Sequence, residues 1–415
     1  MSSRFVSLSL VLAACGGPAS TSPDASGDVL DAGDSGQPRC ISPVHDRQWG
    51  GSGDDDASVA ISRTGAIYVF GSTHGAANDD IAPGTGASGY LDRYDGDTRL
   101  WSFTDPSINS FDLVKPALDG SLEVVGRSAQ GNQLDLAIGS LSADGHARGF
   151  ERAGSAPSER PFQLLADGDQ RAIVGYHDVY VPTNFVEAWE DPFVFRWNVN
   201  AGPAAGTLAT LHSNESDIAT GAAFAADGSV LVAGASLNGD GSWVRPSTSG
   251  LGEPVWKTVG DLEELREIHR LADGDFIIAG TTMRALGTAV GGQDVFVARL
   301  APDLATTRWV TQLGSAGDDR ALDLAIDDTG RTWILGETTG DVAAPHAGEY
   351  DLFVIALDES GTERWRVQRG SEGDERPTAL AVDACENVLV AGATSGPLVA
   401  PASRYDAFLL SVRPD

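Results

Sequence analysis

Short apolar runs separated by turns recur along most of the chain. The stretch 309–365 contains one whole unit, in which the tryptophan strand "WVTQLG" and the acidic loop "SAGDD" precede the apolar runs "ALDLAI", "TWILG" and "DLFVIALD". Runs of this length, bounded by turns that contain glycine or Asp-Asp, are typical of strands and too short for ordinary helices. The pattern therefore predicts four short strands in each unit and no long helix.

Two landmarks give the number of units. Tryptophans recur at intervals of about 50 residues over much of the chain, which is a blade-sized period. An apolar strand that ends in glycine occurs seven times, as "IYVFG", "LEVVG", "RAIVG", "VLVAG", "FIIAG", "TWILG" and "VLVAG". Six of these strands follow a turn with glycine, whereas the seventh follows "DACEN" at 383–387, which has none. Seven units of four strands predict an all-β, seven-bladed β-propeller.

The residues of the unit resemble a known repeat. Tryptophan, G-x-x-G-D-D, an apolar strand, a D-x-x-G turn, a strand ending in Gly-x-Thr and D-x-F-V-x-x-L follow one another as in the bacterial seven-bladed β-propeller repeat called SBBP. The resemblance is close in units one, five, six and seven, and looser in units two to four, where "GDD" is missing. It implies a propeller in a secreted or lipid-anchored protein, and it brings no catalytic motif.

The order of strands predicts how the ring closes. The last unit stops at "DAFLLSVRPD" with three strands, while the strand around Trp49 has no blade of its own. We expect the Trp49 strand to complete the seventh blade as its outermost strand. Cys40 precedes this strand and Cys385 lies in the first turn of the same blade, so we expect a disulfide between them in an oxidising compartment. The alternative is two unrelated thiols.

The N-terminus predicts export and anchoring. Residues 1–14 carry one basic residue and the short apolar run "FVSLSLVLAA", as a signal peptide does. The end "LAAC" resembles a bacterial lipobox, which implies a lipid on Cys15 and a membrane partner; the alternative is an ordinary secretory signal with a chance cysteine. Gly16 favours the outer membrane, with the protein periplasmic or surface-exposed. Residues 15–44 are rich in Gly, Pro, Ser, Ala and Asp and predict a flexible tether before a propeller over 45–415.

Charge excludes one class of partner. The chain has 59 acidic and 28 basic residues, a formal net charge of -31 and a pI near 4.3. Binding of phosphate backbones needs basic surface, so nucleic acid is not an expected partner.

The acidic loops are the first candidate site. Each precedes the predicted innermost strand of a blade, so their carboxylates gather on one face around the axis. The six acids with the clearest motif are Asp54, Asp55, Asp318, Asp319, Asp374 and Glu375. Such a ring could bind a protein, a glycan or a cation such as calcium. Its repetition favours the alternative that each acid caps its own loop, and we expect no other cofactor.

Aromatic residues are the second candidate. Trp49, Trp101, Trp256, Trp309 and Trp365 recur once per unit, which favours packing between blades over sugar-stacking platforms. Trp189, Trp197 and Trp243 lie off this register in units three and four, and they are the better candidates for a ligand surface.

The sequence contains no H-E-x-x-H, G-x-S-x-G or P-loop motif. We therefore expect a non-enzymatic lipoprotein of the cell envelope that displays a propeller for binding a protein or a glycan. The alternative is a polysaccharide lyase or hydrolase whose site lies at the axis of the acidic face, since two of the many acids could stand at a catalytic distance.

Overall fold

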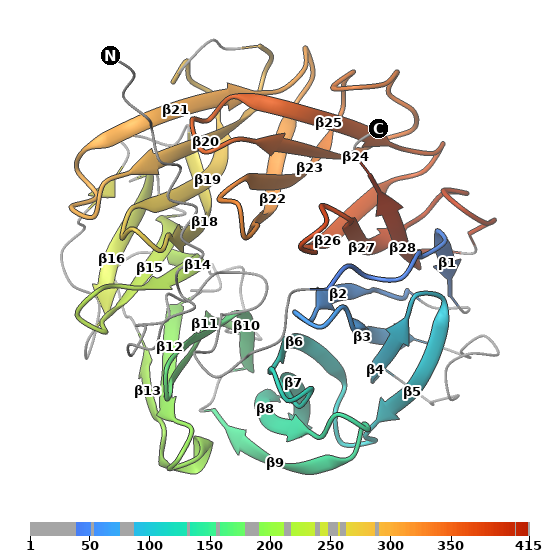
Figure 1. Cartoon of the computed structure of the whole chain (residues 1–415), viewed down its shortest axis with the longest axis vertical. Coiled ribbons are helices and arrows are strands. Elements are labelled where there is room, and N and C mark those ends of the chain that lie inside the picture. Colours follow the sequence, from blue (N-terminus) through green and yellow to red (C-terminus); the bar gives the residue numbers. More distant parts are fainter. Residues whose placement is uncertain are drawn as a thin grey trace, which may run out of the picture.

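Seven four-stranded antiparallel sheets surround a common axis in the computed structural model (Figure 1). The structure describes residues 39–50, 54–74, 87–130, 133–154, 158–178, 191–210, 217–236, 241–247, 256–257, 263–286, 290–402 and 404–413. In these ranges the sole helical element is the short 3-10 helix η1 (Pro203–Ala205). The predicted seven-bladed, all-β propeller is confirmed.

Each blade is one sheet, and its strands follow one another outward from the axis. Blade 1 contains β2 (Ser58–Ile61), β3 (Ile67–His74), β4 (Ala87–Asp95) and β5 (Thr98–Thr104). Blade 2 contains β6 (Ser110–Pro116), β7 (Leu122–Gln130), β8 (Gln133–Leu141) and β9 (Ala147–Ala153). Blade 3 contains β10 (Ser158–Asp167), β11 (Gln170–Asp178), β12 (Asp191–Asn198) and β13 (Thr207–Thr210). Blade 4 contains β14 (Asp217–Phe224), β15 (Val230–Ser236), β16 (Gly241–Ser247) and β17 (Trp256–Lys257).

The later blades follow the same order. Blade 5 contains β18 (Glu263–Arg270), β19 (Phe276–Thr282), β20 (Asp294–Leu300) and β21 (Thr307–Leu313). Blade 6 contains β22 (Asp319–Ile326), β23 (Thr332–Thr338), β24 (Asp351–Leu357) and β25 (Glu363–Arg369). Blade 7 contains β26 (Glu375–Val382), β27 (Val388–Thr394), β28 (Asp406–Val412) and β1 (Arg47–Trp49).

Burial explains the two kinds of apolar pattern in the sequence. The middle strands β24 and β27 are buried at every residue, because both faces of a blade pack against neighbouring blades. The outer strand β5 instead alternates between exposed and half-buried residues, since one of its faces meets solvent. Continuous apolar runs therefore belong to the middle of each blade, and alternating runs belong to its rim.

The ring closes as the strand order predicts. β1 is antiparallel to β28 and pairs Gln48 with Phe408, and Figure 1 shows β1 beside β28 in blade 7. The Gln48 side-chain oxygen accepts the Val399 amide at 2.9 Å, as Gln368 accepts the Val342 amide at 2.7 Å in blade 6. The N-terminal strand thus reproduces the loop contacts of an ordinary outer strand.

This register corrects the position of one tryptophan. Gln48 faces Phe408 as Gln368 faces Phe353, so the two glutamines are equivalent. Trp365 precedes its glutamine in the sequence, whereas Trp49 follows its own. Trp49 is therefore not the counterpart of the other outer-strand tryptophans, and the glutamine is the better landmark.

Two of the repeated tryptophans join neighbouring blades, as expected. Trp101 of blade 1 donates its indole N–H to the Ala143 carbonyl of blade 2 at 3.0 Å, and Trp309 of blade 5 donates to the Glu359 carbonyl of blade 6 at 3.0 Å. A Cβ atom on Gly361, whose φ is +77°, would lie 2.5 Å from the Trp309 ring. Glycine in this turn therefore gives the indole room to pack.

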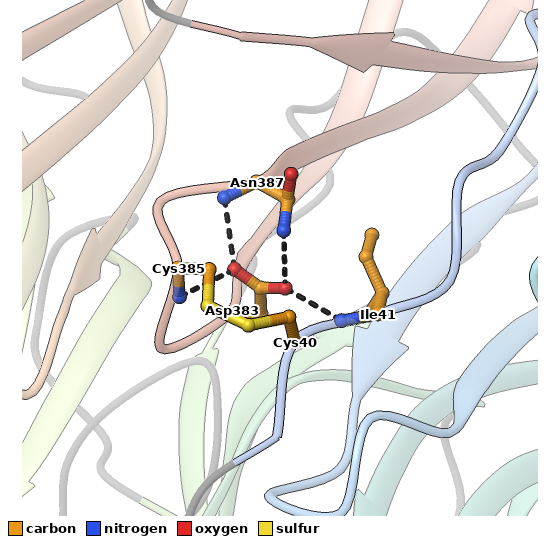
Figure 2. Close-up of a disulfide and its surroundings, with 5 residues drawn as sticks. All are labelled: Cys40, Ile41, Asp383, Cys385 and Asn387. Atoms are coloured by element: carbon orange, nitrogen blue, oxygen red, sulfur yellow. Dashed lines mark hydrogen bonds between the residues drawn. A yellow bond between two sulfur atoms is a disulfide. The ribbon is translucent and has the colours of Figure 1, made fainter.

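The disulfide between Cys40 and Cys385 is present, with 5.4 Å between the Cα atoms and a sequence separation of 345 (Figure 2). Beside it, the Asp383 carboxylate accepts the amides of Cys385 and Asn387 at 2.8 Å each, and the Ile41 amide at 2.7 Å. The carboxylate thus links the N-terminal segment to the turn.

These contacts explain how the seventh turn forms without glycine. Glu386 has a φ of +62° at the position where Gly330 has +80° in blade 6. A left-handed backbone is unfavourable for glutamate and persists where the surroundings enforce it. Ile41 and Val44, next to the disulfide, are buried against blades 1 and 7, so packed structure extends back into the segment just before β1.

Candidate functional site

The second acid of each complete acidic loop is buried and accepts hydrogen bonds from its own loop. The Asp319 carboxylate accepts the Ser315 amide at 2.6 Å, and Glu375 accepts the Ser371 amide at 2.8 Å and the Thr394 hydroxyl at 2.8 Å. Both residues are 0% exposed. In blade 1, Asp55 accepts the Thr73 hydroxyl.

Burial and these hydrogen bonds shift the pKa values of the two buried acids in opposite directions. Burial raises the pKa of the Asp319 carboxyl, and the hydroxyls of Thr338 and Ser315 partly reverse that effect. Burial likewise raises the pKa of the Glu375 carboxyl. Because their oxygens already hold protein donors, these acids are placed to cap loops, as the repetition suggested.

The first acid of each loop also makes a hydrogen bond or an ion pair. Asp318 accepts the Gln293 amide of the preceding blade at 3.0 Å, and Asp54 forms an ion pair with Arg404 at 3.2 Å. Asp374 accepts the Arg376 side chain at 2.7 Å and the Tyr405 hydroxyl at 2.8 Å. Across the described part of the chain, no group of three His, Cys, Asp or Glu side chains is arranged to hold a metal ion.

The innermost strands carry a feature that the sequence pattern did not show. In blades 2 to 7 the register between the first and second strands shifts by one residue, which is the mark of a β-bulge. The extra residues, here called the bulge residues, are Asp112, Phe162, Thr220, Arg266, Leu322 and Thr378.

Side chains at or next to the bulges connect successive blades around the axis. Thr220 donates to the Leu265 carbonyl at 2.7 Å, Arg266 donates to the Leu322 carbonyl at 3.3 Å, and Thr378 donates to the Ala57 carbonyl. Directly after two other bulges, Gln163 accepts the Ala222 amide at 2.6 Å and Asp323 accepts the Leu380 amide at 2.7 Å. These contacts extend from blade 3 through blade 7 to blade 1.

One cluster of ionisable groups, a buried histidine with two half-buried acids, lies among these strands. The Glu267 carboxylate is 3.3 Å from Nε2 of His269, whose side chain is 1% exposed. Burial raises the pKa of the Glu267 carboxyl to about 8, and burial together with Glu267 raises that of Asp323 to about 7. Burial lowers the pKa of the His269 imidazole to about 3. Such values would suit proton transfer near neutral pH.

A second constellation, in blades 2 and 3, includes the bulge residues Asp112 and Phe162. Arg127 contacts the Asp112 carboxylate through Nε at 3.0 Å and Nη2 at 2.8 Å. The Phe162 and Tyr176 rings pack with centroids 5.2 Å apart and an interplanar angle of 37°. The sequence analysis missed these four residues, because a one-residue bulge cannot be seen in a strand pattern and their blades depart from the repeat.

Other residues that the sequence suggested as candidates are either buried or outside the described residues. Trp197 and Trp243 are buried, so the expectation that they form a ligand surface is wrong; they fill blades 3 and 4 instead. Trp189 and the predicted lipidation site Cys15 lie outside the described residues. Nowhere in the described ranges is there a helix of the length and apolarity needed to cross a membrane.

The comparisons with known proteins support the architecture. No protein-family model matches the sequence, and no curated protein matches it. Among solved structures, puromycin hydrolase is similar with a TM-score of 0.52 and 12% identity, over 90% of this chain and 55% of that chain. A protein from Lactobacillus plantarum has a TM-score of 0.48 and 14% identity, over 82% and 98% of the chains. An ulvan lyase has 0.43 and 13%, over 86% and 79%. The likeness to puromycin hydrolase shows the fold alone, and the resemblance to the SBBP repeat remains a prediction.

Proposed function

We propose that this protein is a non-enzymatic binding module of the cell envelope, which presents one face of a closed propeller to a protein or glycan ligand. The observation that supports this proposal is that the six predicted acids already have partners within the protein. All six accept hydrogen bonds or form ion pairs within or between neighbouring loops, and Asp319 and Glu375 are fully buried. A face built this way is a rigid scaffold, since its carboxylates are already engaged in holding loops.

Anchoring is the second part of the proposal. A lipid on Cys15 would hold the protein at a membrane surface, and the segment between Cys15 and Cys40 would separate the propeller from it. The variant Cys15→Ser should move the protein from the membrane fraction to the soluble fraction and abolish incorporation of labelled fatty acid. Unchanged fractionation and labelling would contradict the anchor and leave the binding role to be tested by itself.

A panel of polysaccharides and envelope extracts tests the binding role. At least one polysaccharide or extract in the gel should slow the migration of the full protein in affinity electrophoresis. The protein should release no new reducing ends or unsaturated products from it. Product release that follows the concentration of protein would overturn the proposal.

The second candidate is a polysaccharide lyase or hydrolase, and the half-buried pair Glu267 and Asp323 favours it. A carboxyl whose pKa is raised by burial can act as a general acid near neutral pH, as the two groups of a glycosidase do. If turnover is found, Glu267→Gln should abolish it while leaving retention on the polysaccharide intact. Turnover that survives this change would assign catalysis to other residues.

A further inference from the structure

Phe162 departs from the arrangement that three of the other bulge residues share. In blades 4, 5 and 7 the bulge side chain donates a hydrogen bond to the inner strand of the next blade, through Thr220, Arg266 and Thr378. Phenylalanine has no donor for this bond, which contributes about 1 kcal/mol in a typical case. The residue is also 37% exposed. In blade 3 the neighbouring Gln163 makes the contact with blade 4 instead, and Phe162 is left in contact with water.

The exposed ring is held in a defined orientation. It packs on Tyr176 with the centroids 5.2 Å apart, and Tyr176 follows Gly175 on β11 just as Arg127 follows Gly126 on β7. The two aromatic side chains thus form a small platform, here called the Phe162–Tyr176 platform, at the start of the inner strand of blade 3. Aromatic platforms of this kind combine a large apolar surface with little conformational freedom.

A fixed polar pair stands beside the platform in blade 2. Arg127 holds Asp112 through Nε and Nη2, and the Ser110 hydroxyl donates to the same carboxylate at 3.1 Å. Burial alone would lower the pKa of the Arg127 guanidinium, but Asp112 reverses the effect and raises it, and Tyr176 acts in the same direction. The strands that carry this pair, β6 and β7, contact β10, which carries Phe162, so the guanidinium lies near the platform.

The pair remains partly open to solvent. The side chains of Arg127 and Asp112 are 20% and 16% exposed, and Nη1 of Arg127 makes no hydrogen bond with another described residue. A planar guanidinium held by a carboxylate offers donors and acceptors in a fixed geometry.

The combination matches the chemistry of a sugar ring. A pyranose has an apolar C–H face that can stack on an aromatic ring, and hydroxyl groups at its edge that bond to paired charged groups. We propose that the Phe162–Tyr176 platform, together with Asp112 and Arg127, forms a binding subsite for one pyranose unit of a neutral polysaccharide. This inference rests on the proposed binding function and specifies its ligand class.

A neutral glycan fits the charges better than an anionic one. The positive charge of Arg127 is already paired with Asp112, and Asp56 of blade 1 also acts on it. The chain as a whole carries a formal charge of -31, which repels anions at low salt.

The test measures the binding of the full protein to four neutral polysaccharides, β-glucan, xylan, mannan and galactan, with alginate and pectate as anionic comparisons. The key variant is Phe162→Thr, because threonine is the residue that blades 4 and 7 place at this position. It should keep the melting temperature of the wild type and weaken retention on the neutral polysaccharide at least tenfold. Arg127→Gln should weaken retention as well.

The matched control is Leu322→Ala, which changes the bulge residue of blade 6 and should leave retention unchanged. If wild type and Phe162→Thr are retained equally on a neutral polysaccharide, the subsite is overturned while the binding function stands. Retention of alginate or pectate alone would overturn the neutral ligand class. If no polysaccharide is retained and an envelope protein is bound instead, the subsite proposal fails and the wider binding function survives.

Discussion

Removal of the disulfide should lower stability by a large and calculable amount. Cys40 and Cys385 are 345 residues apart, so the bond constrains nearly the whole unfolded chain. In the chain-entropy model a loop of this size corresponds to about 6 kcal/mol at 25 °C, which is an upper value because unfolded chains retain some compactness. Over about 370 folded residues, an unfolding entropy near 2.1 cal/mol/K per residue converts this energy into a decrease in melting temperature of about 8 °C.

The measurement compares oxidised protein with the double variant Cys40→Ser and Cys385→Ser, both in a Cys15→Ser background that removes the third thiol. Thermal and urea unfolding are followed by circular dichroism, and a digest without reductant confirms the bond. The variant should fold to the same spectrum and melt several degrees lower. A difference below about 1 °C would refute the view that covalent closure constrains the unfolded chain.

A control separates the covalent link from the turn that surrounds it. Asp383 accepts three backbone amides and the Asn387 side chain at 2.6 Å, so Asp383→Ala should destabilise the oxidised protein by about 2 to 3 kcal/mol with the disulfide intact. If the two serines distort the turn, the combined variant should lose less unfolding free energy than the sum of the losses caused by the serines and by Asp383→Ala. If they only remove closure, the two effects should add.

Three other predictions concern packing, metal and pH. Trp309→Ala should cost about 2 to 3 kcal/mol in urea unfolding and Trp309→Phe about half as much, because phenylalanine keeps part of the packing but loses the bond to Glu359; equal effects would contradict this. Addition of calcium or of a chelator should shift the melting temperature by less than about 1 °C. Asp319→Ala should destabilise the protein by about 2 kcal/mol, because the Ser315 amide loses its partner. A large shift with calcium would contradict the interpretation that the acids cap their loops. Stability should fall as pH rises from about 4.5 to about 8, by up to about 1.4 kcal/mol per pH unit for each proton, because the pKa of Glu267, raised from 4.5 to about 8, lets the folded protein hold a proton that the unfolded chain has lost. Glu267→Gln should flatten that slope, and an unchanged slope would assign it to other groups.

Much of the architecture could be predicted from the sequence because it repeats. Seven glycine-ended strands and a three-stranded last unit are local features, and they determine both the blade count and the closure by the strand of Trp49. The disulfide followed from the positions of Cys40 and Cys385 relative to that closure. Each of these inferences depends on order along the chain, which a sequence displays directly.

The site could not be predicted in the same way. The bulge adds one residue to an inner strand and changes the direction of a side chain, yet the apolar pattern on either side is unchanged. Phe162 therefore looked like any strand residue, and the partners Tyr176 and Arg127 lie on other strands. The off-register Trp197 and Trp243 drew attention because of their size, although large aromatic side chains are often buried in a core.

The most direct test of the binding account is a hydrogen–deuterium exchange footprint of the protein with the polysaccharide that it retains. We expect slower exchange at the starts of β6 and β10 and along β7 and β11, the strands that carry Asp112, Phe162, Arg127 and Tyr176. Exchange in the turns on the opposite face, such as the turn that contains Asp383, should not change. Protection confined to that opposite face, or none near blades 2 and 3, would contradict the account.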